Sequence, residues 1–93
     1  MRMVMIVIDE DKREELEIFL NRTGARGYTE ISHAAGLGAS GPRLGSRAFP
    51  RTSAVVFTVL DDQALDALRA GVGEFCATCG EQLKMFSWEV EEL

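Results

Sequence analysis

The sequence predicts an α+β domain with the element order β-α-β-β-α-β, in which two helices cover one face of a four-stranded antiparallel sheet. Four segments have strand patterns, and two of these are apolar on both faces. Two longer segments carry apolar residues at helical spacing. A chain of 93 residues that is 46% hydrophobic holds one hydrophobic core, so we expect a single domain over residues 1–93.

The first strand and helix are predicted near the N-terminus. Met3–Ile8 is short and rich in β-branched residues, and an acidic run follows it, which is typical of a strand buried on both faces. Asp9 or Asp11 then caps a helix that we expect to end at Gly24. The helix has an apolar stripe at positions i, i+3 and i+4, formed by Leu16, Phe19 and Leu20.

Two strands and a long loop are expected in the middle of the chain. Gly27–His33 alternates in polarity, which predicts a strand with one wetter face. Ala34–Arg51 contains four glycines and two prolines without sustained periodicity, so we expect a flexible loop at about residues 36–51. Thr52–Leu60 is a β-branched run with apolar residues on both sides and predicts another central strand.

A second helix and a last strand complete the pattern. Asp61 and Asp62 cap a helix that we expect to end at Gly80, and Leu83–Val90 has the alternation of an amphipathic strand. The resulting order is ferredoxin-like and leaves one sheet face without helices. Since the central strands are apolar on both sides, we expect that face to be buried against other subunits in a homo-oligomer.

The overall charge excludes several classes of partner. The net charge of -5 argues against binding to nucleic acid or to anionic membranes, because both select basic surfaces. The longest apolar run, Met3–Ile8, is far shorter than the roughly 20 residues that span a bilayer, so we expect no membrane insertion. We find no export signal and therefore expect a cytoplasmic protein whose two cysteines are free thiols.

One segment of the chain has the opposite charge from the rest. Residues 31–60 contain no Asp or Glu and carry +3 through Arg43, Arg47 and Arg51, whereas the remainder carries -8. A basic segment in an acidic protein favours the binding of one small anionic ligand there. The alternative is that the arginines only keep a loop soluble.

The residues around this segment resemble the PII signal-transduction superfamily. Gly27-Tyr28-Thr29 opens the second strand, Gly36-Leu37-Gly38 follows it, and Phe49-Pro50-Arg51 leads into the third strand. The family pattern there is a Gly-x-Thr strand, a Gly-Phe-Gly step, a T-loop and Leu-Pro-Lys. The resemblance covers nearly the whole chain and implies a homotrimer with inward-facing sheets. It also implies nucleotide binding between subunits and a T-loop that docks on a transporter, enzyme or regulator.

The resemblance and the basic segment together indicate which residues bind the ligand. No cofactor is obligatory, and the candidate effectors are ATP, ADP, AMP and cyclic nucleotides. Compared with the family, the loop at residues 36–51 is short. The family's second phosphate-binding loop, between the second helix and the last strand, is degenerate here, and only Gly80 and Lys84 could still bind a phosphate there. The other expected ligand-binding residues are Thr29, Gly36, Leu37, Gly38, Arg47 and Arg51. The expected partner-binding residues in the loop are Ala39, Ser40, Arg43 and Leu44.

The cysteines support an alternative hypothesis. Cys76-x-x-Cys79 can chelate a soft metal or form a redox disulfide, with His33 as a further candidate ligand, although one such motif supplies only half of a tetrahedral site. Both cysteines also continue an apolar helical stripe and fit buried packing. The alternative hypothesis for the function is therefore a metal- or redox-responsive trimer similar to CutA. A third hypothesis is an adaptor that binds no small ligand. The sequence offers no nucleophile paired with a base, so we do not expect an enzyme.

Overall fold

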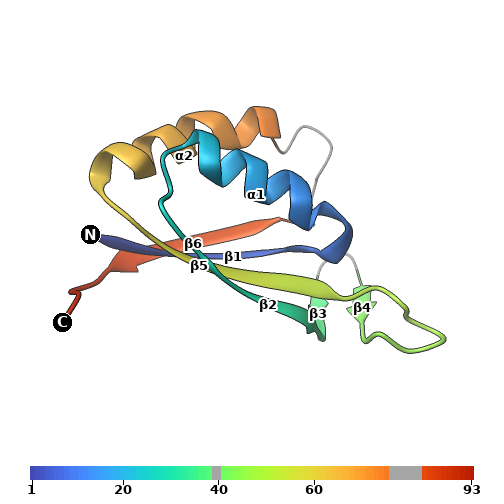
Figure 1. Ribbon diagram of the computed structural model, residues 1–93. Coiled ribbons are helices and arrows are strands. Elements are labelled where there is room, and N and C mark those ends of the chain that lie inside the picture. The colour runs from blue at the N-terminus through green and yellow to red at the C-terminus, as the bar shows by residue number, and fades with distance from the viewer. Residues whose placement is uncertain (39–40, 76–82) are drawn as a thin grey trace.

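The computed structural model describes residues 1–38, 41–75 and 83–93. The predicted α+β, ferredoxin-like fold is confirmed, with both helices on one face of an antiparallel sheet (Figure 1). The elements in chain order are β1 (Arg2–Asp9), the short 3-10 helix η1 (Glu10–Lys12), α1 (Arg13–Arg22), β2 (Thr29–Ala34), β3 (Gly36–Gly38), β4 (Gly41–Arg43), β5 (Ser53–Leu60), α2 (Asp62–Phe75) and β6 (Lys84–Glu89).

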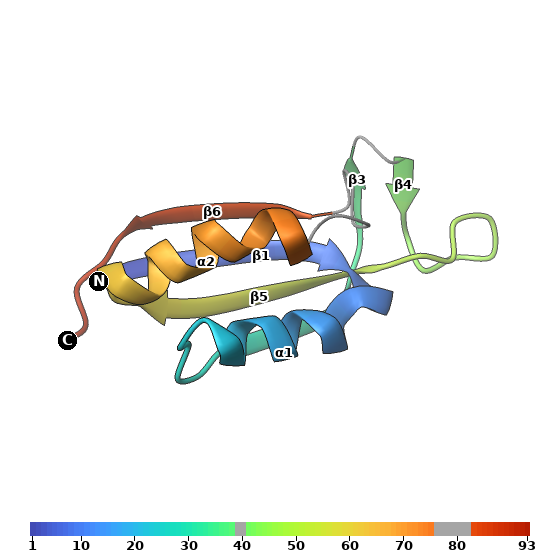
Figure 2. The same cartoon turned by 90° about the horizontal axis from the view of Figure 1, so that it is seen from above.

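The main sheet has the strand order β2-β5-β1-β6, and all of its pairs are antiparallel. The two strands that are apolar on both faces, β1 and β5, are central, as the sequence predicted. In register, Met5 of β1 lies opposite Phe57 of β5 and Phe86 of β6. Figure 2 shows α2 lying over β1 and α1 lying over β2.

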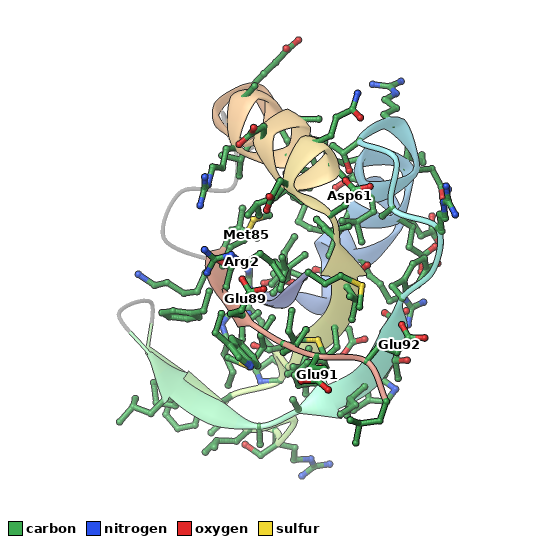
Figure 3. All side chains as sticks on the ribbon, turned by 90° about the vertical axis from the view of Figure 1, so that its left-hand side faces the viewer. Arg2, Asp61, Met85, Glu89, Glu91 and Glu92 are labelled. Atoms are coloured by element: carbon green, nitrogen blue, oxygen red, sulfur yellow. The ribbon has the colours of Figure 1, made fainter. Side chains whose placement is uncertain are left out.

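The hydrophobic core lies between the helices and one face of the sheet. Alternate residues of the two central strands point into it, because side chains on a strand alternate between faces. Met85 of β6 packs against this core, and Figure 3 shows it on the helix side of the sheet. Among the described residues, eleven hydrophobic ones are buried there: Val4, Ile6, Ile8, Leu16, Leu20, Ala25, Ala54, Val56, Leu60, Leu65 and Leu68.

The other face of the sheet is apolar and carries no helix (Figure 1). Its side chains come from all four strands and include four large hydrophobic residues that are 39–53% exposed: Ile31, Val59, Phe86 and Trp88. Met3 lies in register with both Val59 and Trp88, so the exposed residues form a continuous surface across the sheet. Apolar patches of this kind in soluble proteins mark interaction sites.

The central loop contains more regular structure than its composition predicts. β3 and β4 form a separate hairpin in which Gly36 pairs with Arg43 (Figures 1 and 2). A compact turn follows, in which the Ser46 N–H donates to the Phe49 carbonyl at 3.0 Å. Gly41 and Gly45 have φ of 100° and 64°, which non-glycine residues rarely adopt. Of the glycines that suggested irregular chain, Gly41 therefore begins a strand and Gly45 lies in the turn that follows it.

The last turns of α2 provide a paired test of the packing between the helices. Phe19 and Phe75 stack with ring centroids 4.7 Å apart, and a Cβ on Gly71 would lie 2.8 Å from the Phe19 ring. A Cβ on Gly73 would meet nothing within 4 Å. We expect Gly73→Ala to raise the free energy of unfolding by about 0.5–1 kcal/mol. Gly71→Ala should lower it by about 1 kcal/mol, because overpacking outweighs helix propensity. Urea unfolding measures both, and equal gains would contradict this packing.

Candidate functional site

One end of the sheet gathers several of the residues that the sequence selected. β1 ends there at Asp9, opposite Ser53 of β5, and β6 begins there with Lys84 opposite Val7. Arg51 immediately precedes β5, and the β3–β4 hairpin joins the sheet at the same end (Figure 1). Gly36–Gly38, Arg51 and Lys84 therefore share one region at the base of the loop.

Asp9 is the centre of the interactions in this region. Its Oδ2 atom accepts hydrogen bonds from Arg43 Nη1 at 2.6 Å and from Arg51 Nη1 at 3.2 Å, and its Oδ1 atom accepts one from the Asp11 N–H at 2.9 Å. The side chains of Asp9 and Arg43 are 3% and 10% exposed, whereas that of Arg51 is 60% exposed. Arg43 thus anchors the hairpin inside the protein, while Arg51 remains accessible to a ligand.

Glu10 connects the end of β2 to the start of β5, next to Asp9. Its Oε1 atom accepts hydrogen bonds from the His33 N–H at 2.6 Å and from Thr52 Oγ1 at 3.1 Å. Its Oε2 atom lies 3.5 Å from Arg13 Nη1. His33 has a φ of 59°, an uncommon value for a side-chain-bearing residue, and this bond fixes it at a bulge in β2. Asp9 and Glu10 therefore position both ends of the loop.

The Asp9 carboxyl group is held in its charged form. Burial by itself raises its pKa, but the Asp11 N–H bond and the nearby Arg43 and Arg51 outweigh burial, so the pKa lies below the ordinary value of 3.8. The stabilisation that Asp9 provides is complete above that ordinary value and is lost as the pH falls through the lower folded-state pKa. At neutral pH both arginines consequently face a full negative charge.

A small pocket opens beside Arg51. Its volume is about 250 Å³, and its lining consists of Asp9, Glu10, Asp11, Pro50, Arg51 and Thr52. One exposed guanidinium therefore stands among three carboxylates. The pocket can hold a small anion through Arg51, whereas extended negative charge would meet the carboxylates.

Thr29 lies away from this region. It begins β2 at the far end of the sheet, opposite Phe57, and lines a separate hollow of about 330 Å³ with Met3 and Tyr28. Thr29 and Gly36 are seven positions apart, which in extended chain corresponds to roughly 20 Å. Thr29 and Gly36 therefore lie toward opposite ends of β2, in different sheets.

The remaining predicted residues have diverse surroundings. Arg43 was expected to contact a partner, but its burial against Asp9 removes it from the surface. Arg47 and Leu44 lie in the exposed turn, and Leu37 is 80% exposed at the hairpin. Ala39, Ser40, Cys76, Cys79 and Gly80 lie outside the described residues.

His33, the additional metal ligand in the alternative hypothesis, is on the surface. Its side chain is 79% exposed, and its Nδ1 atom lies 3.6 Å from Glu10 Oε1. Within the described ranges, no group of three or more histidine, cysteine or carboxylate side chains is arranged to hold a metal ion. None of the described helices is long and apolar enough to cross a membrane.

The sequence did not predict the roles of Asp9 and Glu10. Asp9 was expected only as a possible helix cap, and of the bonds that the two residues make, only the one that Asp9 Oδ1 accepts from the Asp11 N–H is a capping interaction. The available signal was an acidic pair directly after a buried strand, in a chain whose middle segment has arginines and no carboxylates.

Comparison with known proteins identifies the family. The model of the family described as nitrogen regulatory protein P-II matches residues 1–93. The chain belongs to this family. No curated protein matches the sequence.

Solved structures similar to this P-II-family chain agree in fold. CPII from Thiomonas intermedia K12, a nitrogen regulatory PII-like protein crystallised with ADP, AMP and bicarbonate, has a TM-score of 0.75 at 18% identity, over 96% of this chain and 86% of that one. A Thermus thermophilus structure described as a putative PII-like signaling protein has a TM-score of 0.67 at 20% identity, over 96% and 85% of the two chains.

Because Arg43 is buried and Arg51 is largely exposed, we expect their removal to destabilise the protein by different amounts. Arg43→Ala should lower the free energy of unfolding by about 3 kcal/mol, because it breaks a buried ion pair. Arg51→Ala should lower it by less than about 1 kcal/mol, because that pair is largely exposed and Asp9 keeps Arg43. Chemical denaturation of both variants at pH 7 measures the difference. Equal losses would show that Arg43 has no special anchoring role.

Proposed function

We propose that this P-II-family protein is a cytoplasmic, non-catalytic regulator that binds a small anionic effector, an adenine nucleotide, between the subunits of a homotrimer. Its loop reports occupancy to a protein partner such as a transporter, enzyme or regulator. The observation that carries the proposal is the position of Arg51, an exposed guanidinium at the loop base that shares the Asp9 carboxylate with the hairpin anchor Arg43.

The backbone around Arg51 suits an anion. Gly36 and Gly38 are exposed, and no atom lies within 4 Å of where their Cβ atoms would be, so a ligand can approach the main chain closely. Lys84 is exposed at the same end of the sheet and adds a second cation. The similar CPII structure holds ADP, AMP and bicarbonate, which supports nucleotides and small oxyanions as candidates.

Two features of the single chain support assembly into a trimer. The uncovered sheet face exposes Ile31, Val59, Phe86 and Trp88, which a second and third copy would bury. Thr29 and the Gly36–Gly38 strand lie at opposite ends of β2, so they can form one site only across a subunit boundary. Effector binding and assembly are therefore coupled in the proposal.

Effector binding should raise the melting temperature. A ligand that binds only the native state, at a hundredfold excess over its Kd, stabilises the protein by about 2.7 kcal/mol, which corresponds to a shift of roughly 11–22 °C. We expect such a shift with AMP or ADP in differential scanning fluorimetry, and a loss of most of it in Arg51→Ala. GMP at equal concentration controls for the adenine base.

Two other outcomes of this assay would contradict the proposal. A shift with zinc or copper alone would favour the metal-responsive alternative, and its loss in a Cys76→Ser, Cys79→Ser double variant would assign that site. No shift with any nucleotide, bicarbonate or metal would favour the adaptor that has no small ligand.

A charge on the uncovered face should dissociate the trimer. Phe86 is 53% exposed on that face, and Ile18 is 55% exposed on the outer surface of α1, so the two residues form a matched pair. We expect Phe86→Asp to be monomeric in sedimentation velocity at micromolar concentration, because the charge would be buried between subunits. Ile18→Asp should leave the mass unchanged. A monomeric wild-type protein, or dissociation by Ile18→Asp alone, would exclude this interface.

A further inference from the structure

We propose that Asp9 determines the charge of the anion that binds at Arg51, so that the site accepts one phosphate group or a bicarbonate-sized oxyanion and rejects a triphosphate. This inference rests on the proposed function and specifies the ligand class of the same site. Its basis is that a single carboxylate lies in hydrogen-bond contact with the guanidinium that the effector must use.

Arg51 can exchange Asp9 for an anion without leaving a buried charge unpaired. Asp9 keeps Arg43 at 2.6 Å and the Asp11 N–H at 2.9 Å when Arg51 turns away. Arg43 cannot make the same exchange, because its side chain is only 10% exposed and its departure would disrupt a buried ion pair. The anion therefore competes with Asp9 for one defined group, the Arg51 guanidinium.

The surroundings of Arg51 set a limit on negative charge. The pocket beside it brings Asp9, Glu10 and Asp11 close to one guanidinium. Arg13 lies near Glu10, and Arg43 pairs with Asp9, whereas Asp11 is exposed. A single phosphate gains the charge-assisted bonds to Arg51, and each further phosphate adds charge that these carboxylates repel.

The size of the pocket is compatible with a small anion. At about 250 Å³ it lies below the range of roughly 300–1,000 Å³ that is typical of sites for drug-sized ligands. A tetrahedral or planar oxyanion fits this volume. The selection against a triphosphate therefore depends on the carboxylates around Arg51, and the volume is compatible with a monophosphate or bicarbonate-sized group there.

The test compares Asp9→Asn with Glu92→Gln by isothermal titration calorimetry. Glu92 is exposed near the C-terminus, at the end of the molecule opposite the loop (Figures 1 and 3), so its variant removes one negative charge away from the pocket and controls for net charge. The ligands are inorganic phosphate, bicarbonate, AMP and ATP at fixed ionic strength. Comparing the affinities for inorganic phosphate and bicarbonate with that for AMP shows whether the site binds a free oxyanion or the phosphate of a nucleotide.

We expect wild-type protein to bind AMP at least about tenfold more tightly than ATP, and Asp9→Asn to gain about tenfold in ATP affinity but no more than about threefold in AMP affinity. Glu92→Gln should change either affinity by less than about twofold. Equal gains in the two variants, or no gain in Asp9→Asn, would overturn the role of Asp9 while nucleotide binding stands. An absence of binding of every ligand to wild-type protein would instead overturn the proposed function.

A second measurement on wild-type protein applies if Asp9→Asn does not fold. The Nε–H resonances of Arg43 and Arg51 report their partners separately in nitrogen-15 NMR spectra. On addition of AMP we expect the Arg51 resonance to shift much further than the Arg43 resonance, which keeps its bond to Asp9. An Arg43 shift as large as that of Arg51, or no shift of either under saturating AMP, would rule out exchange at Arg51.

Discussion

The buried ion pair between Asp9 and Arg43 fixes the arrangement of the central loop. A carboxylate that is 3% exposed requires a partner, because an unpaired buried charge is strongly destabilising. Arg43 meets that requirement from β4, so the hairpin must return to the end of β1. Glu10, the next residue, holds β2 through the His33 N–H and β5 through Thr52. Two consecutive side chains thus determine where the loop leaves and rejoins the sheet.

A second constraint is the sheet face that no helix covers. Within the described residues the two α-helices lie on the same side of the sheet. In the proposed trimer, burial of the apolar residues on the other side would couple assembly to the candidate site, because the residues proposed to bind the ligand lie at both ends of β2. In this account the loop base supplies Arg51 from one subunit and Thr29 comes from its neighbour.

The sequence predicted the features that depend on local pattern. β1 and β5 were predicted to be central because their apolar residues occupy both faces, and the strand order β2-β5-β1-β6 confirms that prediction. The β3–β4 hairpin was not predicted, since strands of three residues rich in glycine and proline have no periodicity. The role of Asp9 was also not predicted, because its partner lies 34 positions away and only the folded chain brings them together.

The central claim is that an anion at the loop base changes the loop. Hydrogen–deuterium exchange of wild-type protein with and without saturating AMP tests it most directly, because exchange reports local opening of individual segments. The account predicts altered protection in peptides that cover residues 36–51, with little change at the centres of β1 and β5. Saturable AMP binding that leaves residues 36–51 unchanged would contradict it.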